Sequence, residues 1–481
     1  MDWLTSSLQW YAMLLLLGLI FYPISTKLFG AFIDRGYPFA KTIGILLVSY
    51  AIFLLGFIFP PFHPITLSLV IFGFLIFSAI VHRSKSKEKN HINRRLIIFE
   101  EFLFLASFLF LAWMRGHEPS IHGLEKFMDF GFMNSILRSN HFPPIDMWLP
   151  PRSINYYYFG HLTGSVLIKL SQIKPSIGYN LVLATIFAQG ITLTFSFIIN
   201  LILSLKSRIN TIKLTVFGLV GAFIVNLGGN LHAIYLFTKG YPNENPVPFW
   251  TILSWFNPTH YWYPNATRFI PFTIHEFPSY SYVVADLHGH VFDIPFVLLT
   301  LTLLFVFFTN KKLHNSSPAS PAGGFVIRNS ILFGFLTAIH YMTNAFDGPI
   351  YLLLIFLCYV SLFKFSKRFF LSIGVTIASF IAFSLPFTLT FQPFANGIAM
   401  NCAPQFLITL KKIGPFLFEA DKCQPSALWM LFVLWGFFLI NFILFALSIF
   451  TGKKRETPEQ SDFFIFILFF LGTILILIPE F

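Results

Sequence analysis

Charged residues are scarce in this sequence. Only 11% of its 481 residues are Asp, Glu, Lys or Arg, against about 25% in a typical soluble domain. Hydrophobic residues make up 56% of the chain, and Phe alone contributes 66 residues. A water-soluble fold could not shield so much apolar surface from solvent. The composition argues against soluble enzymes and disordered chains, and it indicates an integral membrane protein.

Cysteine is also rare, and three Cys residues in the whole chain argue against a disulfide scaffold. The net charge of +12 could suggest a nucleic-acid partner, but the Lys and Arg residues are spread along short loops. That distribution is typical of topology signals in membrane proteins. We therefore expect membrane lipids, and no nucleic acid, as partners.

Long apolar segments recur along the chain. A membrane span needs about 20 apolar residues, which predicts an all-α bundle of about twelve transmembrane helices. The predicted spans are about 8–30, 38–60, 65–82, 96–114, 176–205, 214–236, 291–309, 329–345, 349–363, 369–390, 427–450 and 463–479.

Basic residues predict the orientation of the bundle. The loop 83–95 holds six basic residues in thirteen, so it is expected in the cytoplasm. Successive spans alternate in direction, which places twenty of the 32 Lys and Arg residues in cytoplasmic loops. Twelve of the 20 acids and ten of the 14 His residues then lie on the opposite, outer side. We therefore expect the chemistry on the extracytoplasmic face of the cell membrane, in loops 115–175, 237–290 and 391–424. Cys402 and Cys423 share the last of these and could form one disulfide.

The first outer loop contains two acids four residues apart, Glu125 and Asp129. On a helix they would share a face, and the cations Lys126 and Arg138 could keep them ionised. They could equally be solvated charges on an interfacial helix. The run Tyr156 to Tyr158 is similarly open: tyrosines collect at the membrane–water boundary, but three in sequence also place at least one ring inward. Trp148 and His161, near this run, are open to the same two interpretations.

The second outer loop contains potential metal ligands. In an extended segment Asp286, His288 and His290 would point to one side and could hold a divalent metal ion. They could instead be a polar cap over the next helix. Arg268 is the better candidate for an anionic headgroup, because its guanidinium donates two hydrogen bonds in a rigid fork. Asn344 and Asp347 either face the same cavity or form a helix-ending turn.

Several of these blocks follow the order of a family signature. They are Glu125-x-x-x-Asp129, Pro143-Pro-Ile-Asp146-Met-Trp148, Asn155-Tyr-Tyr-Tyr-Phe-Gly-His161, Glu276-Phe-Pro, Asp286-Leu-His-Gly-His290 and Asn344-Ala-Phe-Asp347. Over about residues 96–481 the chain resembles the "YYY" membrane family (DUF2298), which is similar to the GT-C membrane glycosyltransferases. The resemblance implies accessory helices and a basic cytoplasmic loop over residues 1–95, a GT-C-like domain over 96–481, and a domain that continues past Glu480.

The resemblance also implies an activity: transfer of a sugar from a polyprenyl phosphate to an unidentified acceptor. Asp129, or else Glu125, would accept the proton of the acceptor hydroxyl. The spaced Glu-x-x-x-Asp differs from the Asp-x-Asp of many GT-C enzymes, so the resemblance alone does not assign the base. The residues expected to bind substrate are Arg138, Asp146, Trp148, Tyr156, Tyr157, Tyr158, His161, Arg268, Glu276, Asp286, His288, Asn344 and Asp347.

Two other functions fit these residues. A transporter or flippase would move a lipid-linked sugar without covalent chemistry, but transporters place ionisable residues near the bilayer midplane. Few such residues lie in the central thirds of the predicted spans. A metal-dependent hydrolase would instead use Asp286, His288 and His290 as metal ligands.

Overall fold

The computed structural model describes residues 3–83, 93–206, 209–242, 245–310, 322–393, 397–400, 402–414, 416–419, 423–451 and 460–480. These residues are mainly helical and contain little sheet. The chain is therefore a polytopic helical membrane protein, as predicted.

The secondary-structure elements follow one another along the chain. The α-helices are α1 (Trp3–Leu28), α2 (Phe39–Leu55), α3 (Pro64–Arg83), α4 (Arg94–His117), α5 (Lys126–Arg138), α6 (Phe159–Ser171), α7 (Pro175–Leu205), α8 (Thr211–Leu227), α9 (Pro278–Val284), α10 (Gly289–Phe308), α12 (Ala322–Thr343), α13 (Asp347–Phe363), α14 (Lys367–Thr388), α15 (Gln405–Leu410), α16 (Leu428–Thr451) and α17 (Gln460–Leu477). Short 3-10 helices are η1 (Leu231–Phe237), η2 (Phe249–Thr251), η3 (Pro258–His260), η4 (Tyr263–Ala266) and η5 (Ile478–Glu480), and the strands are β1 (Ile398–Met400), β2 (Lys412–Ile413) and β3 (Phe416–Phe418).

A helix lies at each of the twelve predicted spans. Within the described residues, nine helices are long and apolar enough to cross a membrane, and α2 and α13 are shorter apolar helices. The predicted span 214–236 is interrupted, because α8 stops at Leu227 and the short 3-10 helix η1 follows only at Leu231. Gly228 and Gly229 follow α8 directly, and two glycines in succession disfavour a continuing helix.

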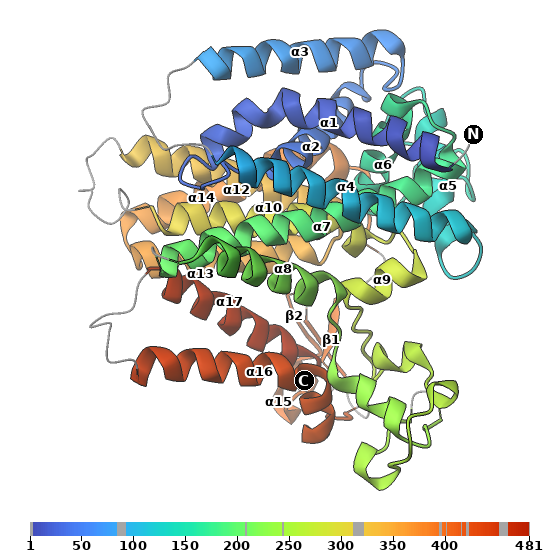
Figure 1. Ribbon diagram of the computed structural model, residues 1–481, viewed down its shortest axis with the longest axis vertical. Coiled ribbons are helices and arrows are strands. Elements are labelled where there is room, and N and C mark those ends of the chain that lie inside the picture. Colours follow the sequence, from blue (N-terminus) through green and yellow to red (C-terminus); the bar gives the residue numbers. More distant parts are fainter. Residues whose placement is uncertain are drawn as a thin grey trace. The chain divides into compact units, whose positions relative to one another are not determined.

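The chain divides into two compact units. Unit 1 comprises residues 1–227 and 281–392, and unit 2 comprises residues 228–280 and 393–481. In unit 1, α7 is almost entirely buried and packs against α4, α6, α8 and α10 (Figure 1). Small residues allow this close packing: a Cβ on Gly190 of α7 would lie 2.1 Å from Asn226 Oδ1 of α8.

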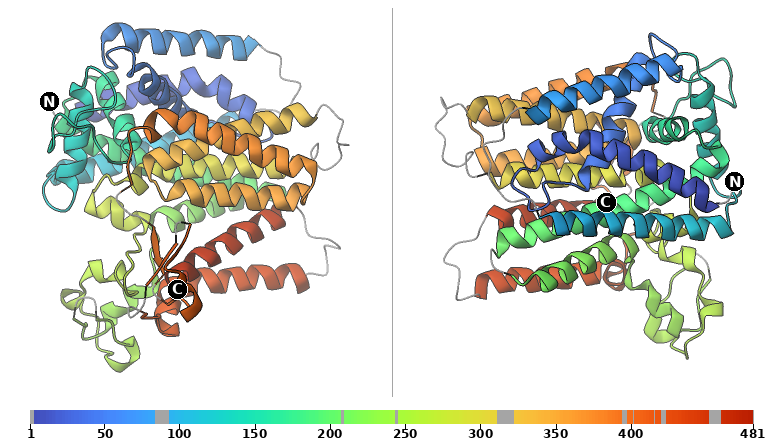
Figure 2. Two further views of the ribbon diagram at one scale, coloured as in Figure 1. Left: turned by 180° about the vertical axis from the view of Figure 1, so that it is seen from behind. Right: turned by 45° about the horizontal axis from the view of Figure 1, so that its top comes forward.

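Helix α3 lies at the edge of unit 1, where it contacts α1 and α2 (Figure 2). Most of its side chains are exposed, and the large hydrophobic ones are Ile65, Leu69, Phe72, Leu75, Ile76, Phe77 and Ile80. An apolar face of this length on a membrane protein is expected to contact lipid.

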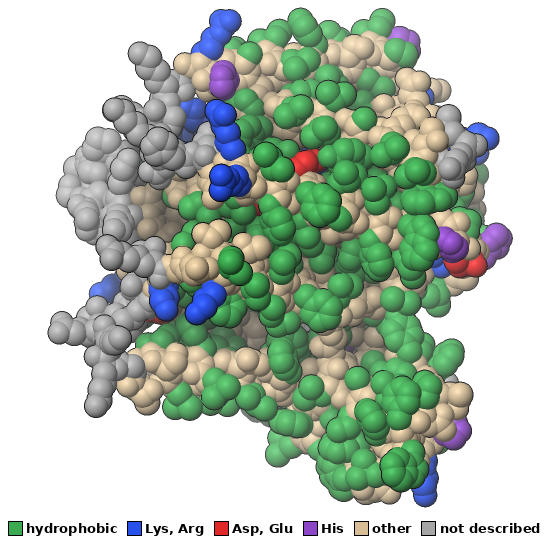
Figure 3. All heavy atoms as spheres, viewed as in Figure 1, with side chains coloured by type: hydrophobic (Ala, Val, Ile, Leu, Met, Phe, Trp, Pro, Cys, Tyr) green, Lys and Arg blue, Asp and Glu red, His purple; other side chains and the backbone are tan. Residues whose placement is uncertain are grey.

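Basic side chains lie at one end of the helices of unit 1. Figure 3 shows Lys and Arg near the end of α3 and the start of α4, beyond a surface dominated by hydrophobic side chains. Arg83 ends α3, and Arg94 begins α4. The carboxyl end of α4 and the amino ends of α7 and α10 lie at the opposite end of unit 1 (Figure 1).

Unit 2 contains irregular segments, a small sheet and two long helices. Its sheet has the order β1-β3-β2, with β1 parallel and β2 antiparallel to β3. Side chains of η1 and α16 form its core with Phe269 and Ile270. Cys402 and Cys423 form a disulfide, in agreement with the sequence-based expectation.

Candidate functional site

Helix α5 buries one of the two predicted catalytic acids and exposes the other. Asp129, Phe132, Met133 and Ile136 are its buried residues, and their spacing is that of a single helix face. Asp129 therefore lies on the buried, apolar face of α5 and is not a solvated charge on the protein surface. Glu125 precedes the first turn of α5, and 56% of its side chain is exposed.

A histidine on α6 fixes the orientation of Asp129. His161 Nε2 lies 2.8 Å from Asp129 Oδ1, and both side chains are fully buried. His161 belongs to the first turn of α6, which closely approaches α10: a Cβ on Gly160 would lie 2.5 Å from the Phe292 side chain. The absence of a side chain at Gly160 thus allows the first turn of α6, which carries His161, to pack closely against α10.

The segment before α10 completes the site. His288 Nε2 lies 2.7 Å from Glu125 Oε2, while His288 Nδ1 lies 3.9 Å from Asp129 Oδ2. Asp286 Oδ2 accepts a hydrogen bond of 3.2 Å from the backbone N–H of Glu125. We call Glu125, Asp129, His161, Asp286 and His288 the acidic cluster; all five belong to unit 1.

The backbone that presents Asp286 is held in a strained conformation. Ala285, directly before it, has a φ of +60°, a left-handed conformation that is unfavourable for a residue with a Cβ. The Tyr179 hydroxyl of α7 donates to the Ala285 carbonyl and accepts from the backbone N–H of Leu287. Strain of this kind persists where neighbouring contacts enforce it, and it clusters at functional sites.

Two carboxylate oxygens in the acidic cluster have no hydrogen-bond donor among the described residues. Asp129 Oδ2 and Asp286 Oδ1 are both buried from solvent. Burial, followed by the interaction with the neighbouring Asp129 carboxyl, raises the pKa of the Asp286 carboxyl to about 8. A proton or a cation between the two carboxylates would relieve their repulsion.

The same groups are suitable metal ligands. Ligand atoms of Asp129, Asp286 and His288 lie within 4.8 Å of one another, and two carboxylates with one imidazole suit divalent transition metals. This set differs from the predicted one, because Asp129 takes the place of His290. The Nε2 atom of His290 lies 3.1 Å from Ser281 Oγ. Asp129 Oδ2 and Asp286 Oδ1, the buried oxygens without donors in the described part of the chain, support a cation site formed by Asp129, Asp286 and His288.

The raised pKa of Asp286 predicts a pH-dependent stability. The folded protein binds this proton more tightly than the unfolded chain, in which an Asp pKa is about 3.9. The contribution of Asp286 to stability is therefore present at low pH and is lost as the pH rises to about 8. In thermal unfolding with a chelator present, we expect Asp286→Asn to raise the Tm relative to wild type more at about pH 8 than at about pH 5. An equal difference at both pH values would contradict the raised pKa.

The three consecutive tyrosines have different environments. The rings of Tyr156 and Tyr157 lie 3.9 Å apart, and burial raises the pKa of both hydroxyls, with further contributions from Glu125 and Asp129. The Tyr156 ring also lies 6.1 Å from the ring of His161, so the pair of tyrosines borders the acidic cluster. Tyr158 is 1% exposed and packs on Phe387, so it is a core residue.

Gly289 begins α10 where several segments meet. A Cβ on Gly289 would lie 2.4 Å from the Thr343 carbonyl oxygen and 2.7 Å from the Tyr157 ring. We expect Gly289→Ala to lower the free energy of unfolding by about 1–3 kcal/mol, because the backbone must shift. Gly374→Ala on α14 is the control, since nothing lies within 4 Å of that Cβ position. Thermal unfolding in detergent measures both, and equal Tm values for the two variants would contradict the packing argument.

Asn344 and Asp347 belong to a neighbouring polar network between α10, α12 and α13. Asn344 Nδ2 donates to Asp347 Oδ2 at 2.9 Å. The Asp347 carboxyl also interacts electrostatically with that of Asp293, and His340 Nδ1 lies 2.7 Å from Asp293 Oδ2. Sequence reasoning did not single out Asp293 and His340 as site residues. Ionisable residues inside apolar segments are costly and are usually functional, which is the signal that could have identified both.

Three predicted substrate-binding residues of the first loop lie outside the acidic cluster. Arg138 is exposed at the end of α5, nine residues after Asp129, or about 13 Å along the helix. Asp146 Oδ1 accepts hydrogen bonds from the backbone N–H groups of Trp148 and Leu149, and so stabilises a turn. The Trp148 side chain is 65% exposed.

Two further predicted residues belong to unit 2. Arg268 is partly buried, with its Nη1 atom 3.4 Å from Thr267 Oγ1. Glu276 is exposed. The acidic cluster itself consists of unit 1 residues, so these two residues are not part of it.

The sequence model of the family described as "Uncharacterized membrane protein (DUF2298)" matches residues 45–480. The chain belongs to the DUF2298 family. The match begins within α2, well before residue 96, where the resemblance of the motifs was expected to begin. It also includes every residue of the acidic cluster. No curated protein and no solved structure matches the chain.

Proposed function

We propose that this DUF2298 protein is a membrane glycosyltransferase that transfers a sugar from a polyprenyl-phosphate donor to an acceptor hydroxyl. The observation that supports this function is the acidic cluster, in which an exposed Glu125 pairs with His288, and the other ring nitrogen of His288 lies 3.9 Å from the buried Asp129. Such a cluster at a membrane surface combines a proton acceptor with groups that can bind a cation. Sugar transfer from a lipid phosphate uses a proton acceptor for the attacking hydroxyl and is favoured by positive charge near the departing phosphate.

The position of the cluster supports an extracytoplasmic active face. The acidic cluster lies next to the amino end of α10, while basic residues flank the junction of α3 and α4 at the other end of the helices. Positive residues favour the cytoplasmic side. We therefore assign the acidic cluster to the outer face of the cell membrane, where lipid-linked donors would reach it from within the bilayer.

We assign the proton-accepting role to Glu125. The acceptor oxygen attacks the anomeric carbon of the sugar and transfers its proton to Glu125. The bond between that carbon and the phosphate oxygen breaks, and the phosphate leaves with the electron pair. Glu125 has exposed surface and is oriented by His288, whereas Asp129 has none. This geometry favours Glu125 over Asp129, the first choice on sequence grounds.

Asp129 and Asp286 then have a binding role. With His288 they could hold a divalent cation, which when bound would stabilise the negative charge of the departing phosphate. His161 donates a hydrogen bond to Asp129 Oδ1 and so fixes the orientation of the carboxylate. The other oxygen, Asp129 Oδ2, then faces Asp286 and His288. Tyr156 and Tyr157 border the cluster and are placed to stack on the sugar.

The network of Asp293, His340 and Asp347 favours a second candidate function. These residues lie within or at the ends of membrane helices, which is where ion-coupled transporters carry ionisable groups. Transport of a lipid-linked sugar without covalent chemistry would use this network in preference to the acidic cluster.

The proposed function is tested by incubating the purified protein with polyprenyl-phosphate [14C]mannose or [14C]glucose and a membrane lipid extract as acceptor. We expect the label to pass to an acceptor as polyprenyl phosphate is released, and a chelator to slow this transfer. Release of free labelled sugar would instead indicate a hydrolase. Donors of both kinds that remain intact would contradict enzymatic activity.

A further inference from the structure

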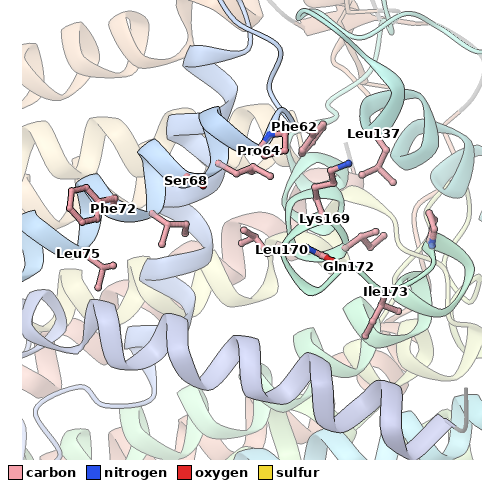
Figure 4. A pocket seen from close by; sticks show the side chains of 14 residues that line it. Phe62, Pro64, Ser68, Phe72, Leu75, Leu137, Lys169, Leu170, Gln172 and Ile173 are labelled. Atoms are coloured by element: carbon pink, nitrogen blue, oxygen red, sulfur yellow. The ribbon is translucent and has the colours of Figure 1, made fainter.

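An apolar groove of about 920 Å³ lies beside α3 in unit 1 (Figure 4). One wall is α3, including Leu67, Phe72 and Leu75, and the opposite wall includes Leu137 of α5 and Ile168 of α6. The volume lies in the range of about 300–1,000 Å³ that is usual for ligand sites. Because the exposed face of α3 contacts lipid, hydrocarbon chains can enter this groove directly from the bilayer.

Three polar residues line the groove: Lys169 and Gln172 lie near one end, and Ser68 lies on the α3 wall. Lys169 and Gln172, at the end of α6, lie near Phe62 and Pro64, while Phe72 and Leu75 lie farther along α3 (Figure 4). Pro64 and Leu75 are eleven residues apart on α3, or about 16 Å along its axis. The groove thus has a cation at its outer end and an apolar floor that extends toward the middle of the membrane.

We propose that this groove binds one anionic phospholipid of the outer leaflet. Its phosphate contacts Lys169 and Gln172, and one acyl chain lies along α3 as far as Leu75. Lys169 is exposed, so it can reach a headgroup at the membrane surface while its aliphatic stem lines the groove. A neutral lipid would fill the apolar part but would leave the charge of Lys169 without a counterion.

The groove is distinct from the site proposed for the glycosyl donor. Lys169 follows His161 by eight residues on α6, which is about 12 Å along the helix. In a sugar monophosphate only one oxygen separates the phosphorus from the reacting carbon. A phosphate held at Lys169 would therefore lie too far from the acidic cluster for transfer, so the lipid proposal does not depend on the proposed function.

Photo-crosslinking tests this proposal in nanodiscs of phosphatidylcholine. The probe is phosphatidylglycerol with a diazirine in its acyl chain, and labelled peptides are mapped. We expect labels between Leu67 and Leu75 of α3, competed by unlabelled phosphatidylglycerol. Lys169→Gln should lower labelling about fivefold, the effect of one Lys near an anionic headgroup. Lys174→Gln is the matched control, because Lys174 is exposed and lies outside the groove; its labelling should equal that of wild type.

A second variant tests the apolar part of the groove independently of the charge. Leu75→Trp should fill the far end and reduce labelling of α3 while Lys169 is retained. The proposal is overturned if Lys169→Gln and Leu75→Trp are labelled like wild type, or if labels spread evenly over all exposed apolar helices. Competition by polyprenyl phosphate but not by phosphatidylglycerol would also overturn it, because the groove would then belong to the donor.

Discussion

Glu125→Gln is expected to lower the rate of sugar transfer by about 10²- to 10⁴-fold, the usual contribution of a general base. Gln keeps the size of the side chain and can still hydrogen-bond His288, whose Nε2 atom lies 2.7 Å from the carboxylate. It cannot accept a proton at neutral pH. The substitution therefore removes the proposed chemistry with little change in packing, because the side chain is 56% exposed.

The loss should appear in kcat, while the KM for the donor changes little. Glu118→Gln is the matched control, since Glu118 is also an exposed acid of the first outer loop and lies outside the acidic cluster. We expect its rate to stay within about twofold of wild type, as for most surface substitutions. If Glu125→Gln transferred sugar at the wild-type rate, the assignment of the base would fail.

Asp129→Asn is expected to weaken both Mn²⁺ binding and sugar transfer by about 100-fold or more. Removal of an outer-shell partner of a metal costs about 10- to 100-fold in affinity or activity, and Asp129 is placed as a direct ligand. An Asn side chain can still accept the hydrogen bond from His161, which lies 2.8 Å away. The fold should therefore survive, although the negative charge between Asp286 and His288 is lost.

Electron paramagnetic resonance of added Mn²⁺ measures the binding directly, and Asp146→Asn provides the control. The Asp146 carboxylate stabilises a turn through two backbone N–H groups and lies outside the acidic cluster. We expect it to bind Mn²⁺ like wild type. Unchanged Mn²⁺ affinity in Asp129→Asn would show that Asp129 is not a ligand of the bound Mn²⁺, and would contradict the proposed metal site.

The membrane helices were largely predictable because their signal is local. Each is an apolar run of suitable length, and a bilayer leaves such a run few alternatives to a helix. Helix α6 was missed, because thirteen residues are too few for a span and the helix is buried by its neighbours. The burial of Asp129 could have been predicted from the sequence. Asp129, Phe132, Met133 and Ile136 are spaced by three and four residues, so they share one face of a helix.

The acidic cluster was predictable only in part. Glu125, Asp129, His161, Asp286 and His288 were each named as candidates, but their pairing was not. Glu125 and Asp286 are 161 residues apart in the chain, and only the packing of α5 and α6 near α10 brings them together. The structure also separates Arg138 from this group, a distinction that residue type alone cannot make.

The most direct test of the proposed activity uses proteoliposomes and a donor that carries ³H in the polyprenyl chain and ¹⁴C in the sugar. If the protein transfers sugar, ¹⁴C will leave the ³H-labelled lipid and appear on an acceptor with wild-type protein, and Glu125→Gln will show almost none of this transfer. If both labels stay on one molecule that crosses the bilayer equally fast with either protein, the protein is a lipid-linked-sugar transporter and the account is contradicted.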